Sequence, residues 1–125
     1  MEVVKTEMAP AAIGPYSQAV KSGGFVFCSG QIALRPDGSM VEGNVEDETK
    51  QVMENLKAVL AAAGSVLSKV VKTTLYLASI SDFAKVNEVY GSYFTENKPA
   101  RATVGVGELP KGARVEIDCV AEATM

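Results

Sequence analysis

Histidine is absent from this chain of 125 residues, and its absence excludes much of enzyme chemistry. Neither a Ser-His-Asp nor a Cys-His arrangement can form, and most zinc and iron sites lose their commonest ligand. Only two cysteines are present, Cys28 and Cys119, which are too few for a thiolate metal site, and no CxxC pair occurs. We expect no metal, and two reduced thiols buried among the apolar, strand-forming residues around them.

An excess of positive charge is also missing. Lys and Arg number 12 and Asp and Glu number 15, which gives a net charge of −3, and no basic run occurs. Proteins that bind nucleic acid usually carry a basic stripe and a positive excess, so we expect no nucleic-acid partner. Neither GxGxxG nor a P-loop of the GxxxxGKS or GxxxxGKT type is present, which excludes these two devices for binding nucleotide phosphates.

Long hydrophobic runs are missing as well. No apolar run approaches the roughly 18 residues of a membrane span, and the residues after Met1 lack the pattern of a secretory signal. With 47% hydrophobic and 22% charged residues, the composition is that of an ordinary globular protein. The length is that of a single domain and suffices to bury a core without disulfides. We therefore expect one domain over residues 1–125, in the cytoplasm, with no membrane partner.

The strongest periodic pattern predicts a helix between Asn44 and Gly64. Asn44 is a suitable N-cap, three carboxylates follow it near the positive end of the helix dipole, and Gly64 is a suitable stop. A second helix opens at Ser81–Asp82 and ends before Pro99, which cannot continue it. The apolar stripes of the two helices are Val52, Met53, Leu56, Val59, Leu60 and Ala63, and Phe83, Val86, Tyr90, Tyr93 and Phe94.

The remaining patterns predict strands. Residues 16–29 indicate a hairpin around two adjacent glycines, and residues 68–78 are dense enough in β-branched and aromatic side chains for a strand largely buried on both faces. Two further strands, near 101–107 and 114–122, flank a turn at 110–112, and the last strand alternates apolar and polar residues almost cleanly. We predict an α+β domain with its two helices on one face of the sheet. The other face is half polar, which suits solvent or a partner subunit, and the sequence favours the subunit only weakly.

Two charged side chains in the closing strands are the leading candidates for chemistry. Arg101 stands at a strand start, where its guanidinium can hold a carboxylate through two parallel hydrogen bonds. Glu116 lies between two apolar residues on the last strand, and a carboxylate in such surroundings can have a raised pKa and act as acid or base. By spacing alone, a solvated arginine and an ion-pairing glutamate are the commoner interpretations. Without histidine, however, carboxylates are the main groups left for proton transfer.

Four smaller signals accompany these two residues. Tyr16, Ser29 and Gly30 lie in segments typical of turns and strand edges, where glycine lets a ligand approach the backbone and a hydroxyl or N–H can donate a hydrogen bond. Asn87 lies beside the apolar stripe of the second helix. Each of them, taken singly, is more often part of a turn, a strand or a helix boundary than of a binding site.

In their order and spacing, the motifs of this chain resemble those of one family over nearly its whole length. They are Gly14–Ala19 (GPYSQA), Ser29–Gln31 (SGQ), Val70–Thr74 (VVKTT), Lys98–Ala102 (KPARA) and Val115–Ile117 (VEI). No single motif is decisive. Together they are similar to those of the reactive intermediate deaminases, the RidA or YjgF-like family.

This resemblance implies a chorismate-mutase-like α+β fold with a mixed sheet, assembled as a homotrimer around a central barrel. The sites of the family lie in clefts between subunits. Its deaminases hydrolyse short-lived 2-imino and 2-enamino acids, such as 2-iminobutanoate, 2-iminopropanoate and 2-aminoacrylate, to 2-keto acids and ammonia. Pyridoxal-phosphate enzymes release these substrates, and the deaminase itself needs no metal or cofactor.

The resemblance also implies roles for individual residues. Arg101 matches the arginine that grips the substrate carboxylate, and Glu116 matches the glutamate that positions the attacking water. Thr103 stands where the family often has cysteine, at a position whose backbone carbonyl helps to hold water. The other residues that match substrate-binding positions of the cleft are Tyr16, Ser29, Gly30 and Asn87.

Two other functions stay open at this point. The same cleft can bind small carboxylates without turning them over, which would make the protein a regulatory module. Ribonuclease or translation-inhibitor activity is attributed to some relatives. The acidic balance and the lack of histidine argue against phosphodiester cleavage.

Overall fold

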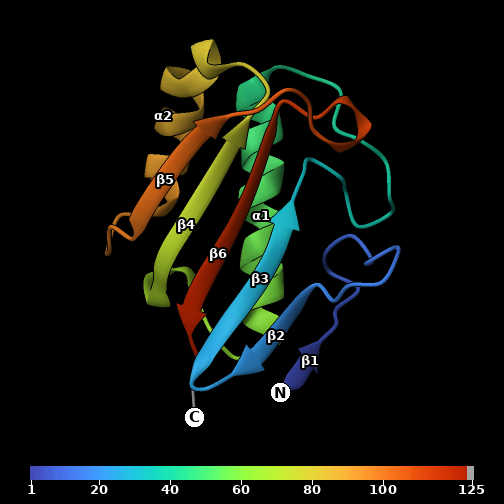
Figure 1. Ribbon diagram of the computed structural model, residues 1–125, viewed down its shortest axis with the longest axis vertical. Helices are drawn as coiled ribbons and strands as arrows, with labels where there is room; N and C mark the ends of the chain where they lie inside the picture. Colours follow the sequence, from blue (N-terminus) through green and yellow to red (C-terminus); the bar gives the residue numbers. More distant parts are fainter. Residues whose placement is uncertain (124–125) are drawn as a thin grey trace.

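The computed structural model describes residues 1–123 as two helices on one face of a six-stranded sheet (Figure 1). The helices are α1 (Val45–Ala62) and α2 (Phe83–Tyr93). The strands are β1 (Glu2–Val4), β2 (Ala19–Ser22), β3 (Phe25–Gln31), β4 (Val70–Leu77), β5 (Ala100–Gly105) and β6 (Val115–Glu122). The predicted α+β class, with both helices on the same face, is confirmed.

The strand order is β1-β2-β3-β6-β4-β5. All neighbours are antiparallel except β4 and β5, which are parallel and joined through α2, so the sheet is mixed. β6 therefore lies in the interior of the sheet, whereas β5 lies at its edge. This order places the two leading candidates, Glu116 and Arg101, on a central and an edge strand.

Helix α1 begins and ends where local sequence signals place it. The Asn44 side chain accepts a hydrogen bond from the Asp47 N–H at 2.8 Å, and the Asp47 carboxylate accepts one from the Asn44 N–H, which forms a capping box. Gly64, just past the end, has φ +77°, a conformation that glycine adopts without strain. The members of the predicted stripe that are fully buried on the helix are Val52, Met53, Leu56, Val59 and Leu60.

The predicted hairpin is confirmed, but its first strand is shorter than expected. β2 begins at Ala19, and the residues from Tyr16 to Gln18 belong to the preceding loop. The buried Gln18 side chain explains the difference. Its amide hydrogen-bonds to backbone groups of the loop, accepting from Thr6 N at 2.7 Å and donating to Pro10 O at 2.7 Å. These bonds fix residue 18 to the loop, so β2 does not extend back through residues 16–18.

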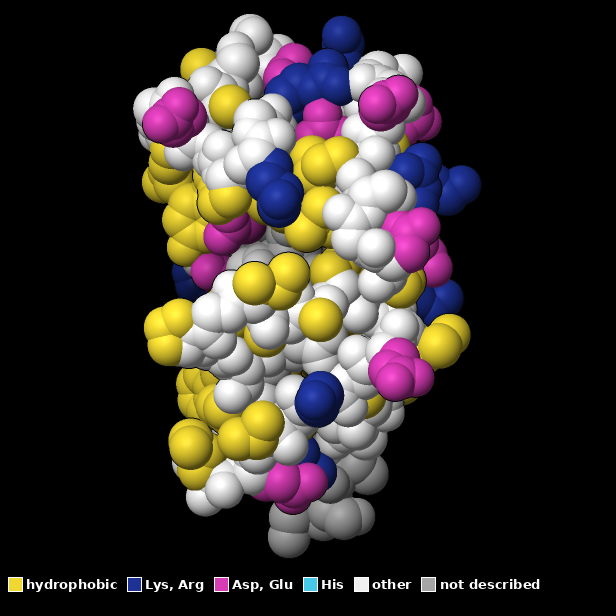
Figure 2. All heavy atoms as spheres, turned by 90° about the vertical axis from the view of Figure 1, so that its right-hand side faces the viewer, with side chains coloured by type: hydrophobic (Ala, Val, Ile, Leu, Met, Phe, Trp, Pro, Cys, Tyr) yellow, Lys and Arg dark blue, Asp and Glu magenta, His cyan; other side chains and the backbone are white. Residues whose placement is uncertain are grey.

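The side chains of β4 are fully buried on one face only, which corrects the expectation of burial on both. Thr73, Leu75 and Leu77 face the helices and are buried, while Thr74 and Tyr76 point the other way and are only partly covered. The reason is that, within residues 1–123, neither α1 nor α2 covers the second face of the sheet, which we call the open face (Figure 1). Hydrophobic side chains gather along the left margin of Figure 2, on the side of the open face. Phe25, Phe27 and Val104 are between 39% and 44% exposed.

The burial of the two thiols and the position of the second helix match the predictions from the sequence. Cys28 on β3 stands opposite Cys119 on β6, and both are buried and unlinked. Helix α2 buries Val86 and Tyr90 and ends before Pro99. Among residues 1–123, neither helix is both long and apolar enough to cross a membrane, and no three His, Cys, Asp or Glu side chains cluster closely enough to hold a metal ion.

Candidate functional site

Arg101 lies on the helix side of the sheet. On β5 it stands opposite Thr73 of β4, whose buried side chain faces the helices, so Arg101 points toward α2. Its Nη1 donates to Asn87 Oδ1 at 2.6 Å. The guanidinium carbon lies 5.1 Å from the centre of the Tyr90 ring and 5.5 Å from that of Phe83, within the range of cation–π attraction. An arginine carries five N–H donors, so this one can bind a carboxylate while Asn87 and the rings orient it.

Thr103 follows Arg101 on the same side of β5, opposite Leu75. Its hydroxyl oxygen is buried and has no hydrogen-bond partner among the residues that the structure describes. A buried polar atom of this kind is costly unless something bonds to it. The structure thus brings Arg101, Asn87 and Thr103 together as one group, which we call the arginine half of the candidate site.

Glu116 lies on the opposite, open face of the sheet. On β6 it stands opposite Tyr76, and it lines a cavity of about 590 Å³ together with Tyr16, Ser29 and Gly30. Tyr16 is 54% exposed, and Ser29 Oγ donates to the Ser17 carbonyl at 2.6 Å, which ties β3 to the loop that carries Tyr16. These four residues form the glutamate half of the candidate site.

The surroundings of Glu116 favour its protonated form. Partial burial, and secondarily the Asp118 carboxylate, raise the pKa of Glu116 above its usual value. Asp118 in turn accepts a hydrogen bond from the Tyr76 hydroxyl at 3.0 Å, and this bond contributes most to the raised pKa of Tyr76. A carboxyl group with a raised pKa exchanges protons with water and amines more readily near neutral pH.

This raised pKa leads to an expected stability effect. The folded chain holds the Glu116 proton more tightly than the unfolded chain does, so the free energy of unfolding falls as the pH rises from the ordinary glutamate value through the raised one. We expect Glu116→Gln to have an equal or higher Tm at about pH 7, with the difference shrinking toward about pH 4. Thermal unfolding across this range tests the effect, with Glu122→Gln on the same strand as control. The expectation would be wrong if the Tm of Glu116→Gln fell below that of wild type as the pH rises from about 4 to about 7.

Gly30 allows the Glu116 carboxylate to lie where it does. A Cβ at position 30 would stand 2.1 Å from Glu116 Oε2, a distance that no such contact tolerates. For the imine hydrolysis that the family resemblance implies, we expect Gly30→Ala to displace the Glu116 carboxylate and to lower turnover by about tenfold to a hundredfold, because a misplaced carboxylate loses its orientation toward the substrate. Assay of imine hydrolysis tests this expectation. Gly91→Ala, in open space on α2, is the control, and unchanged activity of Gly30→Ala would contradict it.

Gln18 is a residue of this region that its motif alone did not single out. Its side chain is 3% exposed and bonds to the loop backbone at Thr6, Ala9 and Pro10. Because that loop supplies one wall of the glutamate half, Gln18 positions the wall. A polar residue two positions after Tyr16 and just before a strand is the only signal of this role in the sequence, and it does not reveal which backbone groups the side chain meets.

The two halves do not meet within one chain. Arg101 faces the helices on the edge strand β5, while Glu116 faces away from them on β6, with β4 between the two strands. The sheet itself therefore separates the guanidinium from the carboxylate. The structure gathers the seven predicted residues into two groups on opposite sides of the sheet.

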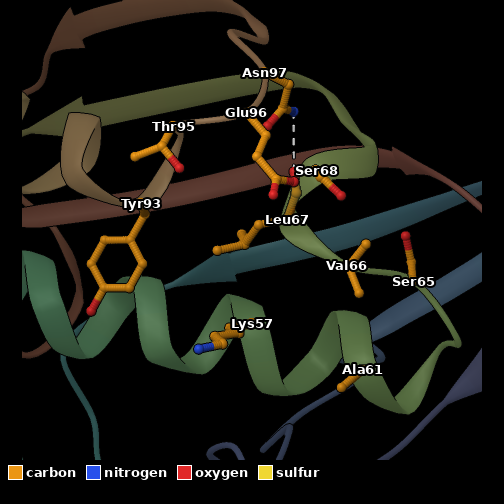
Figure 3. A pocket seen from close by; sticks show the side chains of 10 residues that line it. All are labelled: Lys57, Ala61, Ser65, Val66, Leu67, Ser68, Tyr93, Thr95, Glu96 and Asn97. Atoms are coloured by element: carbon orange, nitrogen blue, oxygen red, sulfur yellow. Dashed lines mark hydrogen bonds between the residues drawn. The ribbon is translucent and has the colours of Figure 1, made fainter.

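A separate hollow of about 480 Å³ contains none of the predicted site residues. Figure 3 shows it between α1 and the chain that follows α2, with Lys57 on one side and Glu96 on the other. Asn97 lies above it and donates to the Leu67 carbonyl at 3.1 Å. Because this hollow includes no residue of either half, Lys57 is a useful control position in experiments on the site.

Comparison with known proteins shows the class to which this fold and these motifs belong. The profile of the family described as Endoribonuclease L-PSP matches residues 6–123. A RutC family protein of Pyrococcus horikoshii is 54% identical over 96% of either chain. The 2-iminobutanoate/2-iminopropanoate deaminase of Mus musculus is 50% identical over 96% of this chain and 90% of its own length. The crystal structure of RidA from the Antarctic bacterium Psychrobacter sp. matches with a TM-score of 0.93 at 45% identity, over 98% of both chains.

The chain is therefore a small α+β protein with the same fold as the solved RidA structure. It belongs to the family of reactive intermediate deaminases, whose motifs it carries from Gly14 to Ile117.

Proposed function

We propose that this protein is a 2-iminobutanoate/2-iminopropanoate deaminase. It hydrolyses reactive 2-imino and 2-enamino acids, such as 2-aminoacrylate, to 2-keto acids and ammonia. The observation that carries this proposal is the arginine half of the site, where Asn87 and two rings orient a guanidinium that can grip a carboxylate. The mouse relative of that name, 50% identical over nearly the whole chain, supports it.

The site that we propose forms between two copies of the chain. The arginine half of one copy meets the glutamate half of the next, because the sheet keeps the two halves of any one copy apart. The exposed Phe25, Phe27 and Val104 on the open face suit burial against other copies. A homotrimer with three such sites satisfies both requirements, since each copy then supplies one half to each neighbour.

In the reaction, Arg101 holds the substrate carboxylate and so orients the C=N carbon toward one water molecule. Glu116 accepts a proton from that water as its oxygen bonds to the carbon, and gives this proton to the imine nitrogen, which yields a carbinolamine. Glu116 then takes the hydroxyl proton of the carbinolamine and gives it to the amino nitrogen, so that the C=O bond forms as the C–N bond breaks, and ammonia and the 2-keto acid leave. The residues that line the substrate's path are Tyr16, Ser29, Gly30, Asn87 and Thr103.

These steps use only groups of this chain and water, so we propose that the enzyme works without a cofactor. Imines already hydrolyse in water, and orientation with proton transfer supplies the modest acceleration that is needed. We place the protein in the cytoplasm, where the buried free thiols Cys28 and Cys119 stay reduced. The reaction there would limit damage by imines that escape from pyridoxal-phosphate enzymes.

A coupled assay tests the proposed function. A serine or threonine dehydratase, or an amino-acid oxidase, generates the imine while semicarbazide traps whatever remains. We expect the protein to reduce the amount of trapped imine and to raise the yield of 2-keto acid. If wild-type protein leaves the trapped imine unchanged across several imino acids, the enzyme assignment is wrong. Carboxylate binding without turnover would then identify the protein as a ligand-binding regulatory module.

A further inference from the structure

The turn that leads into β6 holds a lysine in an unusual backbone conformation. Lys111 has φ 57° and is the one residue other than glycine with positive φ among residues 1–123. The Pro110 carbonyl accepts the Ala113 N–H at 3.1 Å, and Gly112 also has positive φ, so Lys111 and Gly112 form the centre of a tight turn of the type I′ kind. Asn, Asp or Gly adopt this conformation with less strain. The turn itself therefore does not account for a lysine.

The residues after the turn fix it firmly to the core. Ala113 is buried, and Arg114 donates to the carboxylate of Glu48, from its backbone N–H at 2.9 Å and from Nε at 2.5 Å. Glu48 is itself buried on α1. Strained backbone that the surroundings hold in place occurs preferentially at functional sites. Lys111 is thus kept in one position relative to the sheet.

Lys111 lies in the wall of the cavity that belongs to the glutamate half. Lys111 lines it with Glu116, Tyr16 and Gly30, and it is the only cationic residue among those that do so. Apart from these two charges, the wall consists of apolar and uncharged polar residues. Lys111 is exposed, whereas Glu116 is half-buried in the same cavity wall.

An anionic substrate meets an electrostatic obstacle at this cavity. The chain carries a net charge of −3, and Asp118 lies near enough to Glu116 to raise its pKa. The exposed Lys111 ammonium in the cavity wall offsets this repulsion, and such a charge acts on association and on its salt dependence more than on chemistry. On the basis of the proposed function, we propose that Lys111 is a specificity residue that draws anionic substrates into the glutamate half of the site.

The test measures binding separately from turnover. The probe is 2-oxobutanoate, the anionic product, and its uncharged methyl ester is the comparison ligand, each titrated by calorimetry or NMR at low and high salt. Lys111→Asn removes the charge but keeps a residue suited to positive φ, and Lys111→Arg keeps the charge. Lys57→Gln, in the separate hollow on the helix side, is the matched control.

We expect Lys111→Asn to weaken 2-oxobutanoate binding by about threefold to tenfold at low salt, with the difference shrinking as salt screens the charge. Lys111→Arg and Lys57→Gln should bind like wild type, and the ester should be insensitive to all three. An unchanged Kd in Lys111→Asn, an equal loss in Lys57→Gln, or no binding of 2-oxobutanoate by wild type would overturn the inference.

Imine turnover is then measured on the same variants. We expect Lys111→Asn to raise KM in the same proportion while kcat stays the same, because the lysine acts on capture and not on the reacting atoms. A fall in kcat with unchanged KM would overturn the inference. If the binding pattern holds but no variant, wild type included, hydrolyses imines, then the proposed function fails while the role of Lys111 in anion capture stands.

Discussion

Arg101→Ala is expected to lower kcat/KM for imine hydrolysis by about a hundredfold or more. In the proposed mechanism, the substitution removes two parallel hydrogen bonds from the guanidinium to the substrate carboxylate, and with them the orientation of the C=N carbon toward water. Arg101 is exposed, and its loss costs the fold only the Asn87 hydrogen bond and the contacts with the Tyr90 and Phe83 rings. We therefore expect assembly and Tm to change little.

Two further variants sharpen this experiment. Arg101→Lys keeps the charge but cannot bind a carboxylate through two parallel hydrogen bonds, so we expect it to recover only a small part of the activity. Lys57→Ala, which removes a positive charge in the separate hollow on the helix side, is the control and should act like wild type. Turnover at the wild-type rate in Arg101→Ala would remove the arginine from the mechanism, and a large loss in Lys57→Ala would point to a general effect of charge.

The second large effect is recovery of activity when two inactive variants are combined. Arg101→Ala and Glu116→Gln each lack one half of the site, and each alone is expected to be inactive. In a trimer that contains both, one of the three interfaces joins the intact arginine half of one chain to the intact glutamate half of another. We therefore expect about one third of wild-type activity in mixed trimers, since subunits of a closed ring each use the same two surfaces.

The two variants carry different tags and are produced together, and trimers that contain both are isolated by two successive affinity steps. Isolation in this way shows that the chains have mixed before the assay begins. Each variant purified alone by the same steps is the control. Mixed trimers with no activity would place Arg101 and Glu116 of one chain in the same site and would contradict a site shared between copies.

The secondary structure was largely predictable because its signals are local. The capping box at Asn44, the apolar stripe of α1 and the two glycines of the β2–β3 turn each depend on residues a few positions apart. The errors arose where distant residues intervened. Gln18 hydrogen-bonds to a loop about ten residues earlier, so β2 begins late. β4 has one open face, and this was not predicted because nothing in the composition of β4 says which layer covers each of its faces.

The sequence singled out the residues of the candidate site, whose roles stay predictions, but it did not reveal how the fold arranges them. Motifs along the chain pointed to Arg101 and Glu116, which stand in different strands of the same sheet. The alternation on β5 was visible too, yet its apolar members Ala102 and Val104 face the open side, while Arg101 and Thr103 face the helices. An apolar residue normally suggests the core side of a strand. Here the sense of the alternation depends on how β5 pairs with β4.

Short stretches of the sequence therefore determine the secondary-structure elements and the family motifs. They also determine the residue types of the candidate site, which include an arginine and a glutamate but no histidine. The pairing of Thr73 with Arg101 and of Tyr76 with Glu116 belongs to the folded sheet, and it sends guanidinium and carboxylate to opposite faces. Strand register joins residues that are tens of positions apart in the sequence, and a shift by one residue would turn each side chain to the other face. For that reason, the separation of the site into two halves emerges only when the strands have paired.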